Sequence, residues 1–407
     1  MKCRHCKTEL ELEFLDLGNA PPSNAYLKYD DLRKPEVTYP LRILTCTNCW
    51  LVQTEDYAKA DALFSEDYAY FSSTSKGWLK HAAAYCEMIT ERLGLTADSF
   101  VVELASNDGY LLKNFVANGV PCLGIEPTKS TAEAAKAIGV PVRQQFFGKA
   151  VGEEMANAGE KADLVLGNNV YAHVPDINDF TQGVAALLKP NGVVTFEFPH
   201  LMQLIAQNQF DTVYHEHFSY LSLCAVTSIF EAAGLRVFDV EELPTHGGSL
   251  RVYGCLSDAD HTKTNAVDKL HMAEKKAGLQ TEETYRAFQA KADAVKDEFV
   301  RFLLDAKANG KSVVGYGAAA KGNTLMNYAG IRPDLMPFVC DAADAKIGQY
   351  MPASHIPILA PATLKERRPD YLVILPWNIA EEVMKQNADL AAKGTKFVTA
   401  VPSLKVI

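Results

Sequence analysis

The stretch that most constrains the fold is residues 100–109, which read Phe-Val-Val-Glu-Leu-Ala-Ser-Asn-Asp-Gly. An apolar run is followed at once by a polar turn, and the turn ends in a glycine. Residues 110–118 have the pattern of a helix, and the next apolar run, residues 121–125, ends at Glu126. A strand, a helix and a second strand in this order form a βαβ unit with parallel strands. The chain is therefore predicted to contain a parallel sheet with helices packed on its faces.

The alternation of strands and helices continues to residue 256. Further strands are predicted at residues 141–144, 162–167 and 193–198, and further helices at residues 78–89, 130–137, 179–188 and 223–233. Residues 235–243 and 249–256 read as two strands with no helix between them, which predicts an antiparallel pair. Such a pair at the end of a parallel sheet is the closing feature of the class I methyltransferase sheet. Residues 73–258 are therefore assigned to one α/β domain.

Polar and acidic residues stand where the strands end, and ligands of open α/β sheets bind there. The pattern G-x-G-x-x-G, which lets the pyrophosphate of a dinucleotide approach the backbone, is absent from the turn. Glu126 can accept hydrogen bonds from both ribose hydroxyls of a nucleoside. A nucleoside ligand without a pyrophosphate, such as S-adenosylmethionine, fits both observations. The residues predicted to bind it are Glu103, Ser106, Asn107, Asp108, Gly109, Glu126 and Asn168; Asp108 could instead cap the following helix.

Two C-x-x-C pairs, Cys3 with Cys6 and Cys46 with Cys49, lie near the start of the chain. Four thiolates can close a tetrahedral shell around Zn²⁺, so these cysteines predict a structural zinc site within residues 1–72. The gap between the pairs exceeds the usual ribbon spacing, which indicates a subdomain inserted between them. A zinc ribbon that binds nucleic acid is a competing interpretation, but the net charge of −10 disfavours it.

A second strand–turn–helix unit lies in the last third of the chain. Residues 312–316 read as a strand, and glycines stand at positions 315, 317 and 322 around the turn that follows. Residues 335–340 and 371–375 read as further strands, and residues 259–310 read as long charged helices. Residues 259–407 are therefore predicted to form a second Rossmann-like domain. Its turn could bind NAD(P) or cradle the diphosphate of a sugar nucleotide, with Lys321 as a point charge.

Residues 211–220, Asp-Thr-Val-Tyr-His-Glu-His-Phe-Ser-Tyr, gather a phenol, two imidazoles and a carboxylate in four consecutive positions. Such groups can take up, relay or donate protons near neutral pH. If the segment is extended, Tyr214 and Glu216 lie on one face and His215 and His217 on the other. The alternative is that these side chains only pack and hydrogen-bond between domains.

With these motifs in place, the chain resembles the sugar C-methyltransferases that act on nucleotide-linked 4-keto-deoxysugars. The matching segments follow the family's order along nearly the full length: the four cysteines, residues 103–112, 214–222, 246–251 and 315–323. The resemblance implies a zinc-binding head, an S-adenosylmethionine domain and a C-terminal Rossmann-like domain. It also implies methyl transfer to C-3 of a dTDP-4-keto sugar, in deoxysugar biosynthesis for an antibiotic or a polysaccharide.

The resemblance also implies roles for individual residues. A ketone at C-4 makes the neighbouring C–H acidic, and His217 is the expected base that removes its proton. Glu216 would orient or assist His217, while Tyr214 and His173 would stabilise the enolate and Tyr68 or Tyr70 would close the site. The expected substrate contacts are Tyr70, Asn169, His246, Ser249, Arg251, Gly317, Lys321 and Asn323. His173 could instead cap a loop, and His246 and Arg251 could pair with surface acids.

The overall composition indicates a soluble protein of two or three domains, with 407 residues, 48% apolar and 22% charged. The N-terminus has no apolar segment of the kind found in signal peptides, and no apolar run is long enough to span a membrane. We expect a cytoplasmic monomer whose partners are small molecules rather than nucleic acid or a membrane. Three other functions stay open: methyl transfer to oxygen or nitrogen, an NAD(P)-dependent oxidoreductase, and a non-catalytic zinc ribbon.

Overall fold

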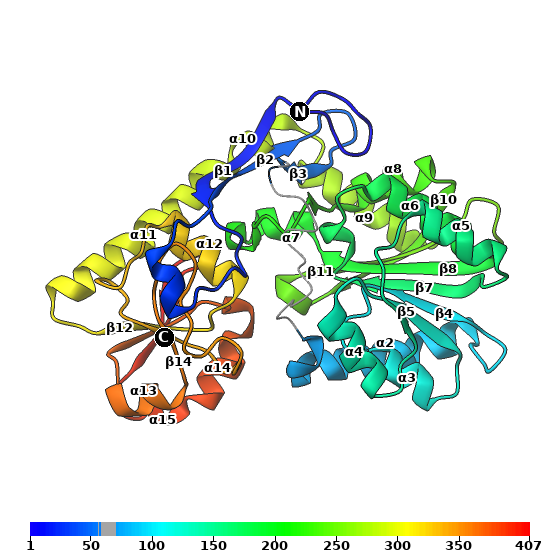
Figure 1. Cartoon of the computed structure of the whole chain (residues 1–407). Helices are drawn as coiled ribbons and strands as arrows, with labels where there is room; N and C mark the ends of the chain where they lie inside the picture. Colours follow the sequence, from blue (N-terminus) through cyan, green and yellow to red (C-terminus); the bar gives the residue numbers. More distant parts are fainter. Residues whose placement is uncertain (56, 58–70) are drawn as a thin grey trace.

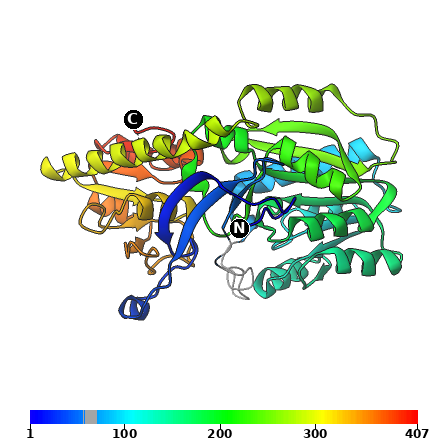
Figure 2. The ribbon, with the colours of Figure 1, turned by 90° about the horizontal axis from the view of Figure 1, so that it is seen from above.

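Three β-sheets organise the chain in the computed structural model, which describes residues 1–55, 57 and 71–407. A seven-stranded sheet in the middle of the chain and a six-stranded sheet near its C-terminus form two lobes. The N-terminal strands lie across the top between these lobes (Figure 1). Viewed from above, the long strands of the head run between the lobes (Figure 2). Each of these two lobes therefore has its own sheet, and a third sheet bridges them.

The seven-stranded sheet has the order β10-β11-β8-β7-β4-β5-β6. Strands β6, β5, β4, β7 and β8 are parallel, while β11 pairs antiparallel with both β8 and β10. This is the class I methyltransferase sheet that the sequence predicts, including its antiparallel end. The strands are β4 (Val101–Leu104), β5 (Cys122–Ile125), β6 (Val142–Arg143), β7 (Ala162–Asn168), β8 (Leu188–Pro199), β10 (Leu235–Leu243) and β11 (Ser249–Leu256).

Helices cover both faces of this sheet, because its central strands are apolar on both sides. Val101 packs in one hydrophobic cluster with α2, α3 and α4, whereas its neighbour Val102 packs in another with α5, α6 and α8. Successive residues of a strand point to opposite faces, which explains the division. These helices and the short α7 are α2 (Lys76–Leu93), α3 (Leu112–Ala117), α4 (Lys129–Ala137), α5 (Lys149–Asn157), α6 (Ile177–Leu187), α7 (Leu201–Ala206) and α8 (Leu223–Ala232).

The head contains an antiparallel sheet of order β1-β2-β3-β9. Its first three strands are β1 (Leu12–Ala20), β2 (Tyr39–Thr45) and β3 (Val52–Thr54). The fourth strand, β9 (Ser219–Tyr220), comes from the segment directly after His217. The polar cluster at residues 211–220 is therefore attached to the zinc-binding head through strand pairing. The part of the head between β1 and β2, with the short helix η1 (Tyr29–Arg33), reaches the C-terminal lobe, where Leu27 bridges to Tyr350.

The C-terminal sheet has the order β14-β13-β12-β15-β16-β17 and is parallel except for β17. Its strands are β12 (Val313–Tyr316), β13 (Val339–Cys340), β14 (Ile358–Leu359), β15 (Tyr371–Ile374), β16 (Lys396–Thr399) and β17 (Lys405–Val406). The strand predicted at residues 335–340 is confined to its last two residues. The helices of this lobe are α12 (Ala320–Tyr328), α13 (Ala362–Arg367), α14 (Ala380–Gln386) and α15 (Ala388–Ala391).

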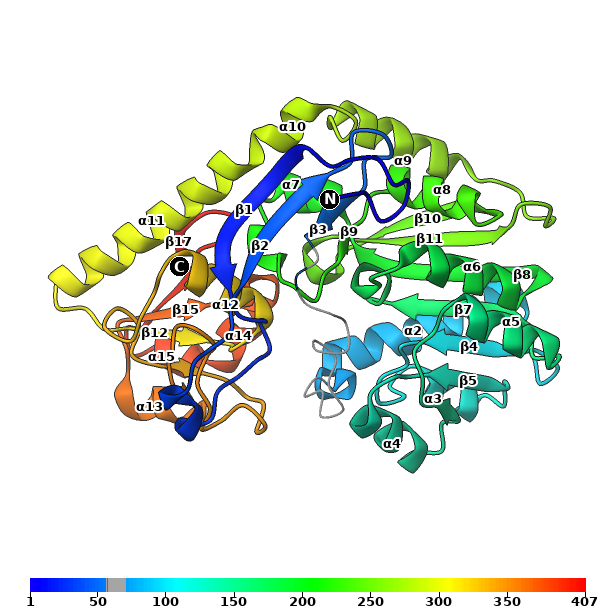
Figure 3. The ribbon, with the colours of Figure 1, turned by 45° about the horizontal axis from the view of Figure 1, so that its top comes forward.

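Three helices connect the lobes along the top of the molecule: α9 (Asn265–Lys276), α10 (Glu282–Arg286) and α11 (Phe288–Ala308) (Figure 3). Helix α9 packs against α8 and β10, whereas α10 and α11 pack against β1 of the head. The ring of Phe14 on β1 stacks on Phe288 with centroids 4.5 Å apart and meets Tyr285 edge-on. The head and the C-terminal lobe therefore share a hydrophobic core. Within the described residues, no helix has both the length and the apolar character of a membrane span.

Candidate active site

A cavity of about 720 Å³ lies at the carboxyl ends of β4, β5 and β7. All three parts of the protein contribute to its wall: Asn24 from the head, Asn107 and Glu126 from the seven-stranded sheet, and Lys321 from α12. Tyr214, Glu216 and His217 line it as well, together with His173 from the loop after β7. The polar cluster at residues 211–220 and the strand ends predicted to hold a nucleoside therefore face one shared space.

A tight turn brings Tyr214 and His217 together. The backbone N–H of His217 donates to the carbonyl of Tyr214 at 3.0 Å, and the two rings pack together with centroids 4.0 Å apart and planes tilted by 35°. His215 points toward the head instead, with Nε2 3.2 Å from the carbonyl oxygen of Pro40. The alternation of an extended segment, which would pair His215 with His217, is therefore wrong here. The turn contains neither glycine nor proline, so its sequence carried no signal for the bend.

The hydrogen bonding of His217 determines which of its ring nitrogens can accept a proton. Nδ1 lies 3.0 Å from the carbonyl oxygen of Thr212. A carbonyl only accepts, so Nδ1 carries the hydrogen and Nε2 of the neutral ring carries the lone pair. Burial lowers the pKa of His217 well below its ordinary value, and the nearby His173 lowers it further. The neutral, basic form of the imidazole is therefore favoured at neutral pH.

His173 has the same arrangement and stands beside His217. Its Nδ1 donates to the backbone carbonyl of Glu216 at 2.7 Å, and the two imidazole centroids are 4.6 Å apart. Burial lowers the pKa of His173 to about 4. His173 ends the short helix η3 (Tyr171–His173), directly after the end of β7. The loop of one lobe is thus hydrogen-bonded to the turn that carries His217.

Glu216 is buried beside the histidines. The resemblance implied that it orients or assists His217, but its carboxyl group is not the group that holds the ring. The carbonyl of Thr212 orients that ring, while Oε1 of Glu216 accepts from Asn24 Nδ2 at 3.2 Å. Burial raises the pKa of the Glu216 carboxyl. Its Oε2 has no hydrogen-bond partner in residues 1–55, 57 and 71–407, although the atom is buried. The carboxyl group of Glu216, which lines the cavity, therefore has one oxygen without a hydrogen bond.

The loop after β4 has the backbone of a ligand-binding turn. Ala105 and Asn107 adopt left-handed φ values of 54° and 50°. Gly109 follows with φ 75°, and a Cβ there would meet Val140 at 3.0 Å, so only glycine fits. Glu126 holds the loop, because its carboxylate accepts from the backbone N–H of Asn107 at 2.8 Å. The backbone of this loop therefore requires glycine at position 109, and the loop is held by the carboxylate of Glu126.

The predicted cofactor residues divide into two groups. Asn107, Glu126 and Asn168 line the cavity, whereas Glu103, Ser106, Asp108 and Gly109 stand behind its wall. Glu103 is buried, which raises its pKa, and the negative charges of Glu126 and Asp108 raise it further. Asp108 accepts from the backbone N–H of Ser73 at 3.0 Å and so joins the loop to the short helix η2 (Ser72–Thr74) that precedes α2. The contact of this second group with the cofactor stays a prediction.

On the opposite wall, Lys321 stands at the start of α12 in a polar cluster. Its Nζ donates to Asn378 Oδ1 at 2.7 Å and lies 4.8 Å from the ring centre of Trp377. The indole N–H of Trp377 donates to Asp211 at 2.8 Å. Burial raises the pKa of Asp211 to about 6, while the positive Lys321 acts against that rise. Lys321 thus supplies positive charge on the side of the cavity that faces the histidines.

The structure brings only part of the predicted substrate set to the cavity. Asn169, His246 and Lys321 line it, and Asn169 Nδ2 donates to His246 Nε2 at 3.1 Å. The remaining described candidates, Ser249, Arg251, Gly317 and Asn323, do not line it. Tyr68 and Tyr70 lie outside the described residues.

The direct substrate contacts expected of Arg251 and Asn323 are not supported by their positions. Arg251 is buried and paired with Glu197 at 2.7 Å and Glu241 at 3.0 Å. The amide of Asn323 donates to the backbone carbonyl of Ser23 at 2.6 Å and so joins α12 to the head. Arg251 therefore connects β11 to β8 and β10, and Asn323 connects α12 to the head.

The remaining two candidates also have local partners. Ser249 donates to the carbonyl of Thr245 at 3.0 Å. Gly317 has φ 88°, and a Cβ there would lie 2.4 Å from Pro376, so the turn after β12 needs glycine for close packing.

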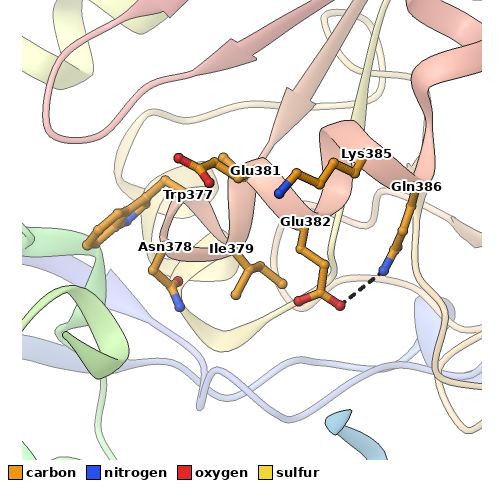
Figure 4. A pocket seen from close by; sticks show the side chains of 8 residues that line it. Trp377, Asn378, Ile379, Glu381, Glu382, Lys385 and Gln386 are labelled. Carbon is orange, nitrogen blue, oxygen red and sulfur yellow. Dashed lines mark hydrogen bonds between the residues drawn. The ribbon is translucent and has the colours of Figure 1, made fainter. Parts of the chain in front are cut away.

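A second hollow, of about 560 Å³, lies at the start of α14 in the C-terminal lobe (Figure 4). Glu381, Glu382 and Lys385 line it, and Glu382 accepts from the amide of Gln386 at 3.1 Å. Trp377 and Asn378 also line this hollow, and their hydrogen bonds to Asp211 and Lys321 connect it to the first cavity. Among the described residues, its lining includes no histidine or cysteine.

The four head cysteines form the arrangement that a zinc ion needs. All four Sγ atoms lie within 4.8 Å of one another, with Cys3 to Cys49 at 3.6 Å and Cys6 to Cys46 at 3.4 Å. Four sulfurs at about 2.3 Å from one zinc ion are about 3.8 Å apart in a tetrahedron. The set is closed by thiolates alone, which is typical of a structural site.

Comparisons with known proteins agree with this architecture. Family models match in sequence order: a zinc binding domain over residues 3–64, a methyltransferase domain over residues 78–240 and a C-methyltransferase C-terminal domain over residues 244–402. The C-methyltransferase NovU of Streptomyces niveus is 35% identical over 406 residues, which span 100% of this chain and 96% of NovU. The chain belongs to this C-methyltransferase family. It is a C-methyltransferase that uses S-adenosylmethionine and has a zinc-binding head.

Other relatives share only one part of the C-methyltransferase. A ubiquinone biosynthesis O-methyltransferase of Rhizobium etli is 31% identical over 98 residues, 23% of this chain and 38% of that protein. A solved methyltransferase in complex with the Trm112 activator of Haloferax volcanii is 14% identical, with a TM-score of 0.37. That match covers 45% of this chain and 94% of the solved one. At this TM-score it carries no weight, and the fold assignment follows from the strand order.

The cavity of the C-methyltransferase fits its cofactor. Both amide atoms of Asn168 are buried without a hydrogen-bond partner in the part of the chain that the structure describes. A polar ligand at the end of β7 would satisfy them. Glu126 and Asn107 flank the same space, and Trp78, Tyr110 and Phe147 supply flat apolar surface. These residues would hold the nucleoside of S-adenosylmethionine at the strand ends.

Several lining residues were not predicted to take part in the site. Trp78 was expected only as the start of a helix, and Asn24 was given no role, yet both line the cavity. Lys346 also lines the cavity and donates to the carbonyl of Ala318 at 2.8 Å. Asn24 and Lys346 are distant in sequence from any strand end of the methyltransferase domain, so no local pattern could have placed them there.

Proposed function

We propose that the C-methyltransferase transfers a methyl group from S-adenosylmethionine to C-3 of a nucleotide-linked 4-keto-deoxysugar, with dTDP as the expected nucleotide. The observation that carries this proposal is the buried His217, whose Nδ1 is bonded to a backbone carbonyl, at the cavity that also holds the strand ends of the methyltransferase domain. The similarity to a C-methyltransferase supports it further, because a carbon acceptor must first become nucleophilic. A methyl acceptor at oxygen or nitrogen needs no such activation.

His217 would act as the general base. Nε2 takes the proton from C-3, the electron pair of that C–H bond forms the C=C bond of the enolate, and the carbonyl π pair moves onto the C-4 oxygen. The Nδ1–H bond to the Thr212 carbonyl at 3.0 Å holds the ring and stabilises the imidazolium that results. A positioned general base of this kind contributes about 10²–10⁴-fold to the rate.

Tyr214 would stabilise the enolate oxygen by donating the hydrogen of its hydroxyl. Neutral His173 already donates its one N–H, on Nδ1, to the carbonyl of Glu216, so it would donate to the enolate oxygen only after Nε2 is protonated. Both rings adjoin His217, with centroids 4.0 Å and 4.6 Å from the centroid of its ring, and all three side chains line the cavity. A donor aimed at the developing charge is worth about 10²–10³-fold in rate, because it needs no reorganisation during the reaction.

The two ligands would occupy opposite ends of the cavity. Asn107, Glu126 and Asn168 would hold S-adenosylmethionine, which supplies an electrophilic methyl group to the enolate carbon. Asn169, His246 and Lys321 would bind the nucleotide sugar, with the Lys321 charge toward its diphosphate. Because the cavity is shared by two lobes, both ligands are brought to the histidines together.

The experiment that tests this function is incubation with S-adenosylmethionine carrying a labelled methyl group and a panel of nucleotide 4-ketosugars. The panel varies the base between dTDP, UDP and GDP, and it includes the corresponding 4-hydroxy sugars as controls. We expect label to enter only the ketosugars, and NMR of the product to place the methyl on C-3. A labelled methyl on oxygen or nitrogen, or equal labelling of the 4-hydroxy sugars, would reject the enolate route.

A further inference from the structure

Arg4 stands inside the zinc-binding knuckle, between Cys3 and Cys6, and its side chain is directed away from the cysteines. Among the described residues, the guanidinium donates to the backbone carbonyls of Phe218 (from Nε, 3.1 Å), Pro175 (from Nη1, 3.1 Å) and Thr54 (from Nη2, 2.7 Å). The planar group lies 5.1 Å from the centre of the Phe218 ring. Arg4 is buried, with 7% of its surface exposed, so these are interior contacts.

Two of these carbonyls belong to the segments that carry the active-site histidines. Phe218 directly follows His217, and Pro175 stands two residues after His173. The third, on Thr54, belongs to a residue whose hydroxyl donates to the backbone carbonyl of His217 at 2.5 Å. One rigid guanidinium fork therefore spans the two loops whose imidazole rings lie 4.6 Å apart.

The knuckle itself is fixed against the rest of the protein. The backbone N–H of Arg4 donates to Gln53 Oε1 at 2.8 Å, and Nε2 of the same glutamine donates to Cys3 Sγ at 3.3 Å. His5 bonds to Asn178 on α6 at 2.8 Å and to Ser228 on α8 at 3.1 Å. A chain of contacts thus runs from a zinc-binding sulfur, through Gln53 and Arg4, to both histidine loops.

We propose that Arg4 is a positioning residue for His173 and His217, and that it connects the geometry of both rings to the zinc-binding knuckle. The proposal deepens the proposed function and rests on it for the role of the two rings. Displacing a reacting group by about 1 Å costs about 100-fold in rate, so loss of the fork should be visible in kcat. The zinc-binding head then has a part in the chemistry without any of its atoms touching the substrate.

The test compares Arg4→Ala and Arg4→Lys with His5→Ala, a change at the neighbouring knuckle residue that removes docking contacts but none to the histidine loops. We expect Arg4→Ala to lower kcat about 100-fold with an unchanged KM for S-adenosylmethionine and unchanged zinc content. Lysine can serve one carbonyl, so Arg4→Lys should be intermediate. His5→Ala should lower the melting temperature while kcat stays near that of the unchanged protein.

A second readout does not depend on the reaction. In protein labelled with ¹⁵N at its ten histidines, the imidazole signals of His173 and His217 should shift in both Arg4 variants and stay in place in His5→Ala. Unchanged imidazole signals, or the same loss of kcat in His5→Ala, would overturn the positioning role. If Arg4→Ala does not fold, Arg4→Lys alone decides between these outcomes. If the unchanged protein makes no C-methylated product, the proposed function fails while the imidazole signals still test Arg4.

Discussion

His217 and His173 each use Nδ1 to bond a backbone carbonyl, Thr212 for one and Glu216 for the other. In the neutral form this leaves the lone pair of each ring on Nε2. His246 is a third histidine of the cavity, and burial lowers its pKa to about 4. The cavity therefore favours three uncharged imidazoles, of which only His217 is packed against the tyrosine of its own turn.

These lowered pKa values predict how stability depends on pH. A histidine of the unfolded chain has a pKa of about 6.5, whereas the pKa values of His173 and His246 in the folded chain are about 4. Between these values the unfolded state binds more protons, so the free energy of unfolding falls as the pH falls through that window. The slope is at most about 1.4 kcal/mol per pH unit for each histidine.

Calorimetric melting at about pH 7 and about pH 5.5 checks this dependence. His246→Gln should reduce the loss of melting temperature between the two conditions, because one buried histidine no longer has to be protonated. His271→Gln, on α9 outside the cavity wall, is the matched control. A His246→Gln variant as sensitive to acid as the unchanged protein would contradict the assignment.

Glu126 permits a separate prediction for the cofactor. Glu126→Ala removes the acceptor expected for the ribose hydroxyls, and hydrogen bonds to a charged group are worth about 1.5–3 kcal/mol. Binding of S-adenosylmethionine should weaken about 10- to 100-fold in titration calorimetry. Glu133→Ala, at an exposed position of α4, should bind the cofactor normally. Unchanged affinity in Glu126→Ala would show that another group holds the ribose.

At the residue scale, the sequence identified the groups that carry charge and protons but not what they contact. Asn107, Glu126 and His217 line the cavity as expected, because strand ends and the 211–220 segment converge there. Arg251 was expected to contact the substrate or to pair with surface acids, and it pairs with the buried Glu197, 54 positions away. Such partners depend on which strands become neighbours, and a local pattern does not contain that information.

At the scale of elements, helix α12 is attached to the turn that carries the base. Thr324 Oγ1 donates to the carbonyl of Val213 at 2.7 Å, and Thr324 is 3% exposed. Thr324→Val keeps the shape but removes this donor, so it should lower the free energy of unfolding by about 1–3 kcal/mol. It should also lower kcat, because Val213 directly precedes Tyr214.

Thr324→Ser is the control for this change, because it keeps the hydroxyl. Calorimetric melting and steady-state kinetics should show serine close to the unchanged protein and valine below it in both respects. If valine and serine have equal kcat values, the contact between α12 and the turn does not matter for the reaction.

Regular elements could be predicted from the sequence, whereas short and distant pairings could not. Strands β10 and β11 begin and end at the predicted residues, since each is a run of eight or nine residues rich in apolar side chains. Strand β9 has two residues and pairs with β3 in the head. A two-residue strand shows no periodicity, and its partner lies far away in the sequence. The attachment of the His217 turn to the head was therefore visible only in the structure.

For the whole molecule, zinc bound by the head should raise the melting temperature. One equivalent of zinc per chain is expected in elemental analysis, because four thiolates close a single site. Cys46→Ser should lose zinc and lower the melting temperature, since the head bridges the two lobes. Cys224→Ser, outside the cluster, should keep both properties. Purified protein without zinc, or Cys46→Ser with a full equivalent, would contradict the closed site.

The central claim for the whole molecule is that His217 removes a proton from the carbon beside a ketone, and deuterium exchange tests it most directly. The 4-ketosugar is incubated in D₂O with the enzyme and S-adenosylhomocysteine, which is expected to fill the cofactor site without a transferable methyl. Mass spectrometry and NMR then follow C-3. We predict one deuterium at C-3 with the unchanged protein and with His271→Gln, and none above background with His217→Ala. Exchange at the normal rate in His217→Ala would contradict the account.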